Sequence, residues 1–469
     1  MTKDLTRGSV AKTLLLFALP MLIGNIFQQL YNIADTIIVG RKIGPDAIGA
    51  VGVSFPIVFL LIAVSMGIGI GCSVIVSQLF GAKKLNEIKK ASYTALICAT
   101  ICGIVFTVIG ASISKPILEF LKTPANIMNM SVEYLKIIFY GSLFVFIYNV
   151  STSIFNALGN SKTPLVFLII SAVLNIFLDL YCIVNLKMGV AGAAVATIIS
   201  QGIAALLAVA YLIYKLHNLN NEKVEKIFDI ELLKTMSKIA LPSMLQQAFV
   251  SLGMMALQGV VNTFGSDVVA GFTAACKIDS IAMMPILNIS NALATFAAQN
   301  MGARKIQRVK DGLKASMIAS VIFSIIIAFL IFNFGEAFIQ MFLDGGQNAA
   351  VIAFGVEYLK KICIYYVIMA VFFNTASILR GAGVMKSFVT SSIMNMVTRI
   401  IFAYSMVGIL GKSTIWYSIV AGWVVGGIIS TVTYLKGNWQ NVNVVSEDIE
   451  EIEAETETNT MSLNAEDYA

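Results

Sequence analysis

Residues 14–40 read LLLFALPMLIGNIFQQLYNIADTIIVG, an apolar run that holds no charged residue before Asp35. A helix needs about 20 apolar residues to cross the hydrocarbon core of a bilayer. Lipid offers no hydrogen bonds to exposed backbone groups, so such a run must form a helix. This stretch therefore predicts a transmembrane helix, and the rest of the chain follows the same pattern.

The composition of the whole chain indicates the same solvent. Its 469 residues are 58% hydrophobic and only 12% charged, whereas a soluble domain carries about 25% charged residues. We therefore expect an all-α integral membrane protein with twelve transmembrane helices. The twelve apolar runs lie near 14–39, 48–78, 91–113, 134–158, 165–186, 190–214, 237–262, 268–298, 315–335, 355–379, 389–410 and 414–436.

Lysine and arginine predict the orientation of these spans. If the N-terminus lies inside, the inner segments carry 21 of the 32 basic residues and the outer segments carry nine. Cytoplasmic loops of membrane proteins hold the excess of positive charge. We therefore expect a multi-pass protein of the cell membrane with both termini in the cytoplasm.

The sequence also repeats itself. Glu133-Tyr134-Leu135-Lys136 recurs letter for letter at residues 357–360, and Leu19-Pro20 recurs as Leu241-Pro242. Each half contains six spans, so the halves share one orientation and are related by an axis along the membrane normal. Such symmetry predicts two pseudo-symmetric six-helix lobes with a cavity between them.

The repeat and the composition together predict the domain boundaries. Residues 447–469 hold nine acidic residues and no basic residue, which is typical of a disordered tail. We expect an N-terminal lobe at 1–214, a cytoplasmic linker at 215–236, a C-terminal lobe at 237–440 and an acidic disordered tail at 441–469.

Acidic residues inside spans are the first candidates for function, because a charge at the bilayer centre costs about 2.5–3.5 kcal/mol on insertion scales. Asp35 ends a polar stripe on the first span, in which Asn25, Gln28 and Asn32 precede it at helical spacing. A hydrogen-bonded packing network is the alternative interpretation of this stripe. The functional interpretation is a carboxylate that binds a cation or a proton.

A second polar group lies in spans five and six. Asn175 and Asp179 are four residues apart and share a helix face, and Thr197 and Gln201 have the same spacing and can face them. Carboxylate, amide and hydroxyl oxygens suit a hard cation or a proton. A structural polar cluster is the alternative here.

The second half has a different set of polar residues. Gln246 and Gln247 occupy the stretch that matches the first-half stripe, and Arg399 stands opposite Asn175 at the repeat offset of 224. Asp279 could act in coupling or in cargo binding, or it could belong to a buried network with Lys277 or Arg399. We assign the cavity and cargo contacts to Gln28, Tyr31, Asn32, Gln201, Gln246, Gln247, Asp279, Met283 and Arg399.

The chain at this point resembles the multidrug and toxic compound extrusion (MATE) family of secondary antiporters, over nearly all of Lys12 to Lys436. The resemblance rests on Leu19-Pro20 and on NIADTIIVG at 32–40, QLFGA at 78–82, its echo QNMGA at 299–303, GNSKTP at 159–164 and LNIFLD at 174–179.

The resemblance implies two six-helix lobes that export cationic drugs in exchange for H⁺ or Na⁺. It also implies that the first-lobe ion site, including a possible Na⁺ site, falls on Asp35, Asn175, Asp179 and Thr197. Some members use an acid in span seven, where this chain has Gln246 and Gln247.

Other classes of protein fit the sequence less well. A membrane-embedded enzyme would need catalytic or metal-binding residues, and the single histidine, His217, cannot build a His-Glu-x-x-His site. Gly411-Lys412-Ser413-Thr414 resembles half of a phosphate-binding loop, but Met406 stands where its first glycine belongs. A flippase for a lipid-linked oligosaccharide remains the main alternative, although only Lys277 and Arg399 would supply positive charge to its cavity.

The expected partners follow from this class. We expect small cationic or amphipathic drugs as cargo, the lipid bilayer as surroundings, no nucleic acid and no cofactor beyond the coupling ion. We also expect the protein to act as a monomer. The six cysteines lie in apolar runs and predict buried thiols rather than a disulfide framework.

Overall fold

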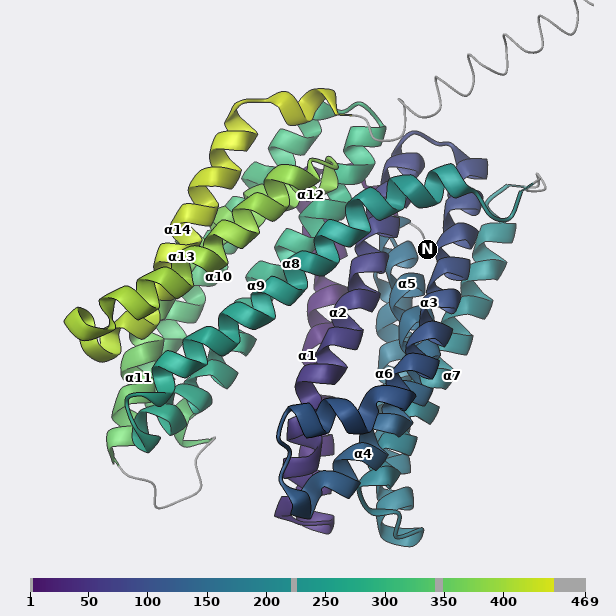
Figure 1. Ribbon diagram of the computed structural model, residues 1–469. Helices are drawn as coiled ribbons and strands as arrows, with labels where there is room; N and C mark the ends of the chain where they lie inside the picture. The colour runs from purple at the N-terminus through teal and green to yellow at the C-terminus, as the bar shows by residue number, and fades with distance from the viewer. Residues whose placement is uncertain (1–2, 221–225, 342–348, 443–469) are drawn as a thin grey trace, which may run out of the picture.

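The computed structural model describes residues 3–220, 226–341 and 349–442, and this part of the chain is built from helices. Fourteen α-helices are present among these residues (Figure 1). Their bounds are α1 Val10–Lys42, α2 Pro45–Gly81, α3 Leu85–Phe120, α4 Ala125–Tyr140, α5 Ser142–Ala157, α6 Lys162–Leu180, α7 Gly189–His217, α8 Ile230–Asn262, α9 Ser266–Gly302, α10 Ile306–Gln340, α11 Ala349–Cys363, α12 Tyr366–Gly381, α13 Met385–Leu410 and α14 Thr414–Leu435. Short turns of helix are η1 Tyr181–Asn185, η2 Gly411–Ser413 and η3 Asn438–Asn441.

The helices account for the twelve predicted spans. Nine apolar segments in the described ranges are long enough to cross a membrane, and two bent helix pairs raise the number to eleven. One of the nine, Met385–Leu435, comprises α13 and α14, which pack against each other and fold back as a hairpin (Figure 1). Counted as two, they bring the number to twelve and confirm the predicted fold class.

The sequence repeat is also a structural repeat. The first half consists of α1 to α7 and the second of α8 to α14. Its clearest sign is a bent span in each half: α4 and α5 meet at 49°, and α11 and α12 meet at 53°. The outer bounds of these two pairs, 125–157 and 349–381, differ by the same 224 residues as the repeated motif.

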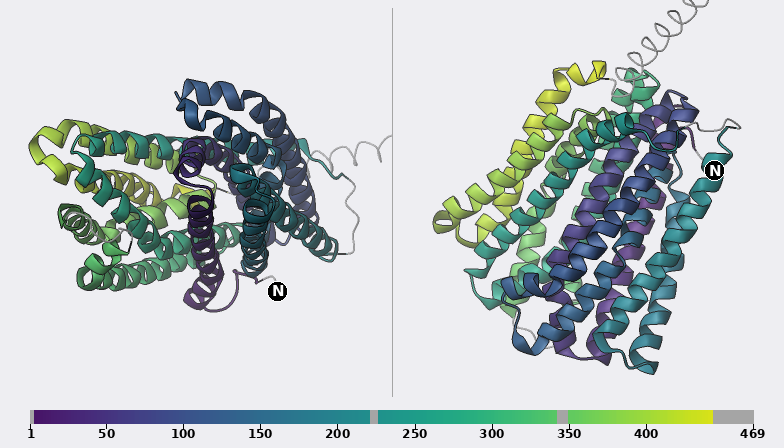
Figure 2. Two further views of the ribbon diagram at one scale, coloured as in Figure 1. Left: turned by 90° about the horizontal axis from the view of Figure 1, so that it is seen from below. Right: turned by 45° about the vertical axis from the view of Figure 1, so that its right-hand side comes forward.

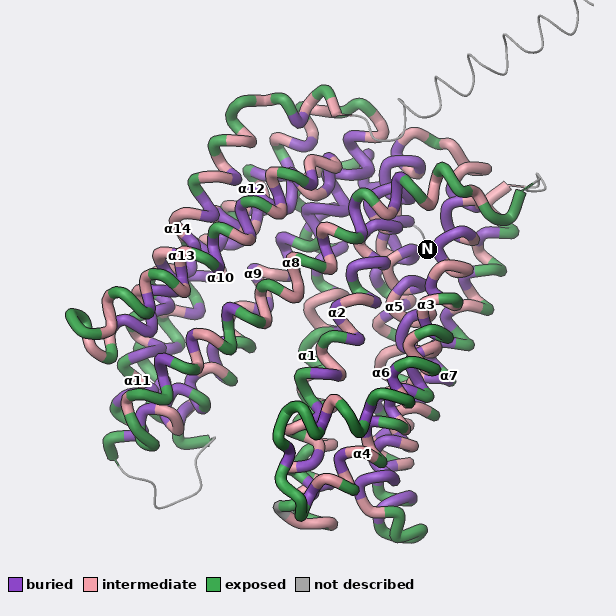
Figure 3. The backbone as a smooth tube through the Cα atoms, viewed as in Figure 1, coloured by how far each residue is buried: buried purple, intermediate pink, exposed green. Residues whose placement is uncertain are grey.

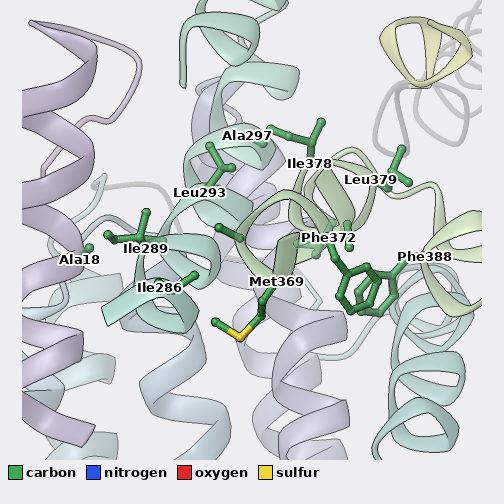
Figure 4. Close-up of a cluster of buried hydrophobic side chains, with 14 of the residues drawn as sticks. Ala18, Ile286, Ile289, Leu293, Ala297, Met369, Phe372, Ile378, Leu379 and Phe388 are labelled. Carbon is green, nitrogen blue, oxygen red and sulfur yellow. The ribbon is translucent and has the colours of Figure 1, made fainter. Parts of the chain in front are cut away.

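Apolar packing joins the two halves through α9. In the most apolar window of α9, 67% of the residues are buried inside the protein, and the helix lies near the middle of the molecule (Figure 3). It packs against α1 and α2 of the first half and against α10, α11 and α12 of the second. Figure 4 shows Ala18 of α1 beside Ile286, Ile289 and Leu293 of α9 in this core.

The two halves meet at one end and diverge at the other. They converge at the end that carries the N-terminus and the α7–α8 linker, here called the linker end, and spread apart toward the opposite end (Figure 1). Figure 2 shows the helices of each half on their own side when seen from that opposite end. Along α1, no residue between Gly24 and Val39 is buried. The middle of α1 therefore lies where the halves are already apart.

α1 contains a proline close to the point where its surroundings change. Pro20 lies inside the helix and cannot donate the usual backbone hydrogen bond. The carbonyl of Phe17, three residues earlier, accepts a hydrogen bond from the Ser161 hydroxyl over 2.8 Å. This side-chain bond ties the first turns of α1 to the loop before α6, while the rest of α1 continues toward the open end.

Candidate functional site

The acidic residues predicted in the first half come together. Asp35 of α1 and Asp179 of α6 bring their carboxyl groups within hydrogen-bonding distance of each other, although they are 144 residues apart in the sequence. Asp179 is fully buried, and η1, a single turn of π-helix, begins two residues after it. Such π turns inside a helix occur frequently at functional sites.

The amide of Asn175 connects Asp179 to α7. With its oxygen and nitrogen assigned so that each meets a complementary group, Asn175 donates to Asp179 Oδ2 over 2.7 Å and accepts from the Thr197 N–H over 3.2 Å. The Tyr31 hydroxyl hydrogen-bonds with the Thr197 side chain. Asp35, Asn175, Asp179 and Thr197, the four predicted ion-coupling residues, therefore form one contiguous group with Tyr31.

The first-half group keeps free acceptor atoms. Asp35 Oδ1 and Asp179 Oδ1 are both buried and have no hydrogen-bond partner among the described residues. An unpaired buried carboxylate oxygen is costly, so it marks a place where a proton or a cation gains binding energy. In the described ranges no group of three or more His, Cys, Asp or Glu is arranged to hold a metal ion. A cation here would thus rest on two carboxylates, an amide and hydroxyls.

The remaining polar residues of the predicted stripe separate. Gln28 and Asn32 are exposed on α1, whereas Asn25 donates to Asn288 of α9 over 2.8 Å and so links the two halves. Gln201 is half-buried one turn beyond Thr197, and no contact between its side chain and the acidic pair is seen. The structure therefore divides the stripe into an inter-lobe contact, an open stretch and the acidic site.

Asp279 is the centre of a second polar cluster, in the second half. It is 6% exposed, and its carboxylate accepts hydrogen bonds from the hydroxyls of Tyr366 and, over 3.4 Å, Tyr358. Arg399 of α13 is 7% exposed and close enough to interact electrostatically with Asp279. The Nε of Arg399 has no hydrogen-bond partner among the described residues. Of the two alternatives raised for Asp279, this arrangement resembles the buried network with Arg399.

The other predicted cavity residues of the second half lie on α8 and α9. Gln246, Gln247 and Met283 are half-buried. Asp279 takes its hydrogen bonds from Tyr358 and Tyr366, not from Gln246 or Gln247. Met283 follows Asp279 by one turn on the same face of α9.

Apart from Tyr31, sequence reasoning missed the tyrosines that accompany the acids. Tyr134 of α4 lies close enough to Asp35 and Asp179 to interact electrostatically with both, and Tyr358 of α11 donates to Asp279. These two tyrosines occupy the same place in the exact repeat at 133–136 and 357–360. The exact repeat could therefore have identified them, because each copy places a tyrosine beside the acidic residues of its own half.

Comparison with known proteins places the chain among transporters. The MatE family model matches residues 20–181 and 242–405. The probable multidrug resistance protein YpnP of Bacillus subtilis (strain 168) is 32% identical over 95% of this chain and 99% of its own. A second protein of that organism, the probable multidrug resistance protein YoeA, is 32% identical over 73% of this chain and 75% of its own.

A solved structure shares the fold along the whole length. It is described as the outward-facing conformation of a multidrug resistance MATE family transporter of the MOP superfamily. It superposes with a TM-score of 0.86 at 25% identity and covers 93% of this chain and 99% of its own.

Proposed function

Because the chain belongs to the MatE family, we propose that it is a secondary antiporter of the cell membrane that exports organic cations in exchange for protons. Members of this family are transporters, so the chain is a transport protein and not an enzyme. The names of its relatives support multidrug export. We further propose that it acts as a monomer.

The close approach of the Asp35 and Asp179 carboxyl groups carries the choice of the proton as coupling ion. Two carboxylates that share a site repel each other when both are ionised, and a proton between them removes this repulsion. The pair is thus built to share a proton, and Asn175, Thr197 and Tyr31 hold it in place. Na⁺ on the same four oxygen-bearing residues is the competing possibility.

The shape of the protein suggests how exchange proceeds. The excess of basic residues at the linker end supports a cytoplasmic position for it, and in the proposed orientation the end at which the halves diverge faces outward. Protons from outside then reach Asp35 and Asp179, remove their negative charge and release a cation that the charge had held. Cargo and protons use the same carboxylates at different times, which couples the two fluxes.

The cargo would contact residues outside the acidic pair. Gln28, Tyr31 and Asn32 lie along the open stretch of α1, and Gln201, Gln246, Gln247 and Met283 are half-buried. Aromatic and thioether groups such as Tyr31 and Met283 suit flat cations. Asp279 and Arg399 act on the cargo indirectly in this scheme, because their charges already interact with each other and are covered by protein.

Transport in inverted membrane vesicles distinguishes the two coupling ions. With an acidic lumen, protons leave through the transporter and a cationic dye accumulates inside. Collapse of the pH gradient should abolish this accumulation, and an imposed Na⁺ gradient at equal pH should not restore it. If a Na⁺ gradient alone drove accumulation, the proton assignment would be wrong and the four oxygen-bearing residues would form a Na⁺ site.

The acidic tail should be dispensable for transport. Residues 447–469, which lie outside the described residues, carry nine acids and no apolar face. A variant that ends at residue 446 should accumulate dye at nearly the rate of the full chain when both are present in equal amounts. Loss of transport at normal abundance would show that the tail takes part in the cycle.

A further inference from the structure

The C-terminal ends of α2 and α9 cross in direct backbone contact at the linker end. A Cβ atom on Gly81 would lie 1.8 Å from the Gln299 carbonyl oxygen, and one on Gly302 would lie 1.9 Å from that of Gln78. No side chain fits into either space, so glycine is required on both sides. All four residues belong to the repeated motif at 78–82 and 299–303. This motif takes no part in the ion site.

Two glutamines of this motif connect the halves symmetrically. Gln78 Nε2 donates to the Gly381 carbonyl in the second half over 3.1 Å, and Gln299 Nε2 donates to the Ala157 carbonyl in the first half over 2.7 Å. Both glutamines are 0% exposed. These two bonds close the linker end, and the lobes cannot part there while both remain.

The symmetry ends at the side-chain oxygens of the two glutamines. Gln299 Oε1 accepts a hydrogen bond from the Leu5 N–H over 3.0 Å, whereas Gln78 Oε1 is buried without a partner among the described residues. Leu5 is 0% exposed and belongs to the main apolar core. A segment that precedes α1 thus completes one of the two glutamine contacts and leaves the other incomplete.

The segment 3–9, here called the strap, touches both lobes. In the second half, Arg308 donates to the carbonyls of Arg7 and Gly8 over 2.7 Å each, and Lys305 donates to that of Thr6 over 2.9 Å. In the first half, the Lys3 N–H donates to the Gly159 carbonyl over 3.4 Å. These contacts are made to backbone carbonyls and amides of the strap. Its backbone therefore anchors it to both lobes, and the Leu5 side chain adds to this by packing in the apolar core.

The corresponding segment of the second half follows another course. When the two halves are aligned so that Pro20 matches Pro242, Leu5 matches Ile227. The Ile227 side chain is 61% exposed. Two residues later, the Asp229 N–H donates to Thr94 Oγ1 of α3 over 3.0 Å. Within the described part of the chain, only the first half therefore supplies a strap, which makes the closure one-sided.

We propose that residues 3–9 form a releasable strap that holds the cytoplasmic side closed, because the Leu5 N–H supplies the hydrogen bond that the side-chain oxygen of Gln299 accepts. Leu5 must withdraw before the lobes can separate at that side. The inference rests on the proposed function, which places the linker end in the cytoplasm. Strap residues thereby set the balance between outward-open and inward-open states, although they lie far from the acidic pair along α1.

Distances between the lobes test the strap directly. Spin labels at Lys162 and Lys386, which are exposed and occupy equivalent places in the two halves, report separation at the linker end in protein whose six cysteines are replaced by alanine. Leu5→Asp places a carboxylate in the apolar core and should release the strap. The population with the longer distance should rise at least fivefold, which corresponds to the free energy of about one hydrogen bond. Arg308→Gln should shift the populations in the same direction.

Arg7→Gln is the matched control. The Arg7 side chain is 70% exposed and, among the described residues, forms an ion pair with Asp4 alone, while its carbonyl remains available to Arg308. This variant should keep the wild-type distances. Wild-type distances in both Leu5→Asp and Arg308→Gln would overturn the proposal, and Arg308→Gln decides alone if Leu5→Asp fails to fold. The distances do not depend on transport, so a shift in a protein that moves no dye would reject the antiport function and keep the strap.

Discussion

Asp35→Asn and Asp179→Asn should each reduce proton-driven dye accumulation to the level of vesicles that lack the transporter. In the proposed mechanism the two neighbouring carboxyl groups share one proton. An amide keeps the size and part of the hydrogen bonding of either residue but cannot exchange that proton. The protein should still fold and insert, because Asn175, Thr197 and Tyr31 retain their contacts with one another.

The double variant gives the prediction its specificity. If the acids act as one unit, replacing both should cost no more activity than replacing either. Asp46→Asn is the control, because Asp46 is exposed at the start of α2 in the same lobe and contacts only Asn126 over 3.4 Å among the described residues. It should transport normally.

Drug-induced proton release from detergent-solubilised protein reports on the pair without a membrane gradient. Wild type and Asp46→Asn should release protons when a cationic drug binds, and Asp35→Asn and Asp179→Asn should not. Asp279→Asn should keep the signal, since its carboxylate is engaged by Tyr358 and Tyr366 in the other half. Loss of the signal in Asp279→Asn alone would move the coupling site to the second half and contradict the mechanism.

Asp279→Ala should destabilise the protein by about 1–3 kcal/mol for each tyrosine hydroxyl that it leaves without an acceptor, the usual cost of an unsatisfied buried polar group. The substitution leaves Arg399 as an uncompensated buried charge and takes the shared acceptor away from two tyrosine hydroxyls. Thermal unfolding in detergent should show a clearly lower midpoint. Asp311→Ala, at an exposed position of α10 in the same half, should unfold like the wild type.

A compensating change separates this charge effect from simple loss of packing. Replacing Asp279 and Arg399 together by leucine removes both charges and restores apolar volume, which is often neutral for stability. The double variant should therefore recover much of the stability lost in Asp279→Ala. If the single variant were as stable as the wild type, or the double variant no better than the single one, the electrostatic account of this cluster would fail.

The sequence by itself determined the class, the number of spans and the repeat. Lipid cannot satisfy backbone hydrogen bonds, so each long apolar run could be assigned as a helix without knowing its neighbours. Helical spacing then placed Asn175 and Asp179 on one face of α6. The repeated Glu-Tyr-Leu-Lys motif marked equivalent places in the two halves, and both copies lie on the first helix of a bent pair.

Only the tertiary structure decided which faces meet. Spacing along one helix says nothing about how that helix is rotated against another, because rotation depends on how side chains of several helices interlock. Asp35 might have continued the stripe of Gln28 and Asn32, yet packing turns it toward Asp179 and leaves those two exposed.

The same reason applies to contacts between the halves. Asn25 meets Asn288 and Leu5 reaches Gln299, although these partners are 263 and 294 residues apart. Lipid-facing and protein-facing apolar side chains look alike in a sequence, because both surroundings are apolar. The positions of these polar contacts therefore emerge only when the lobes are packed together in three dimensions.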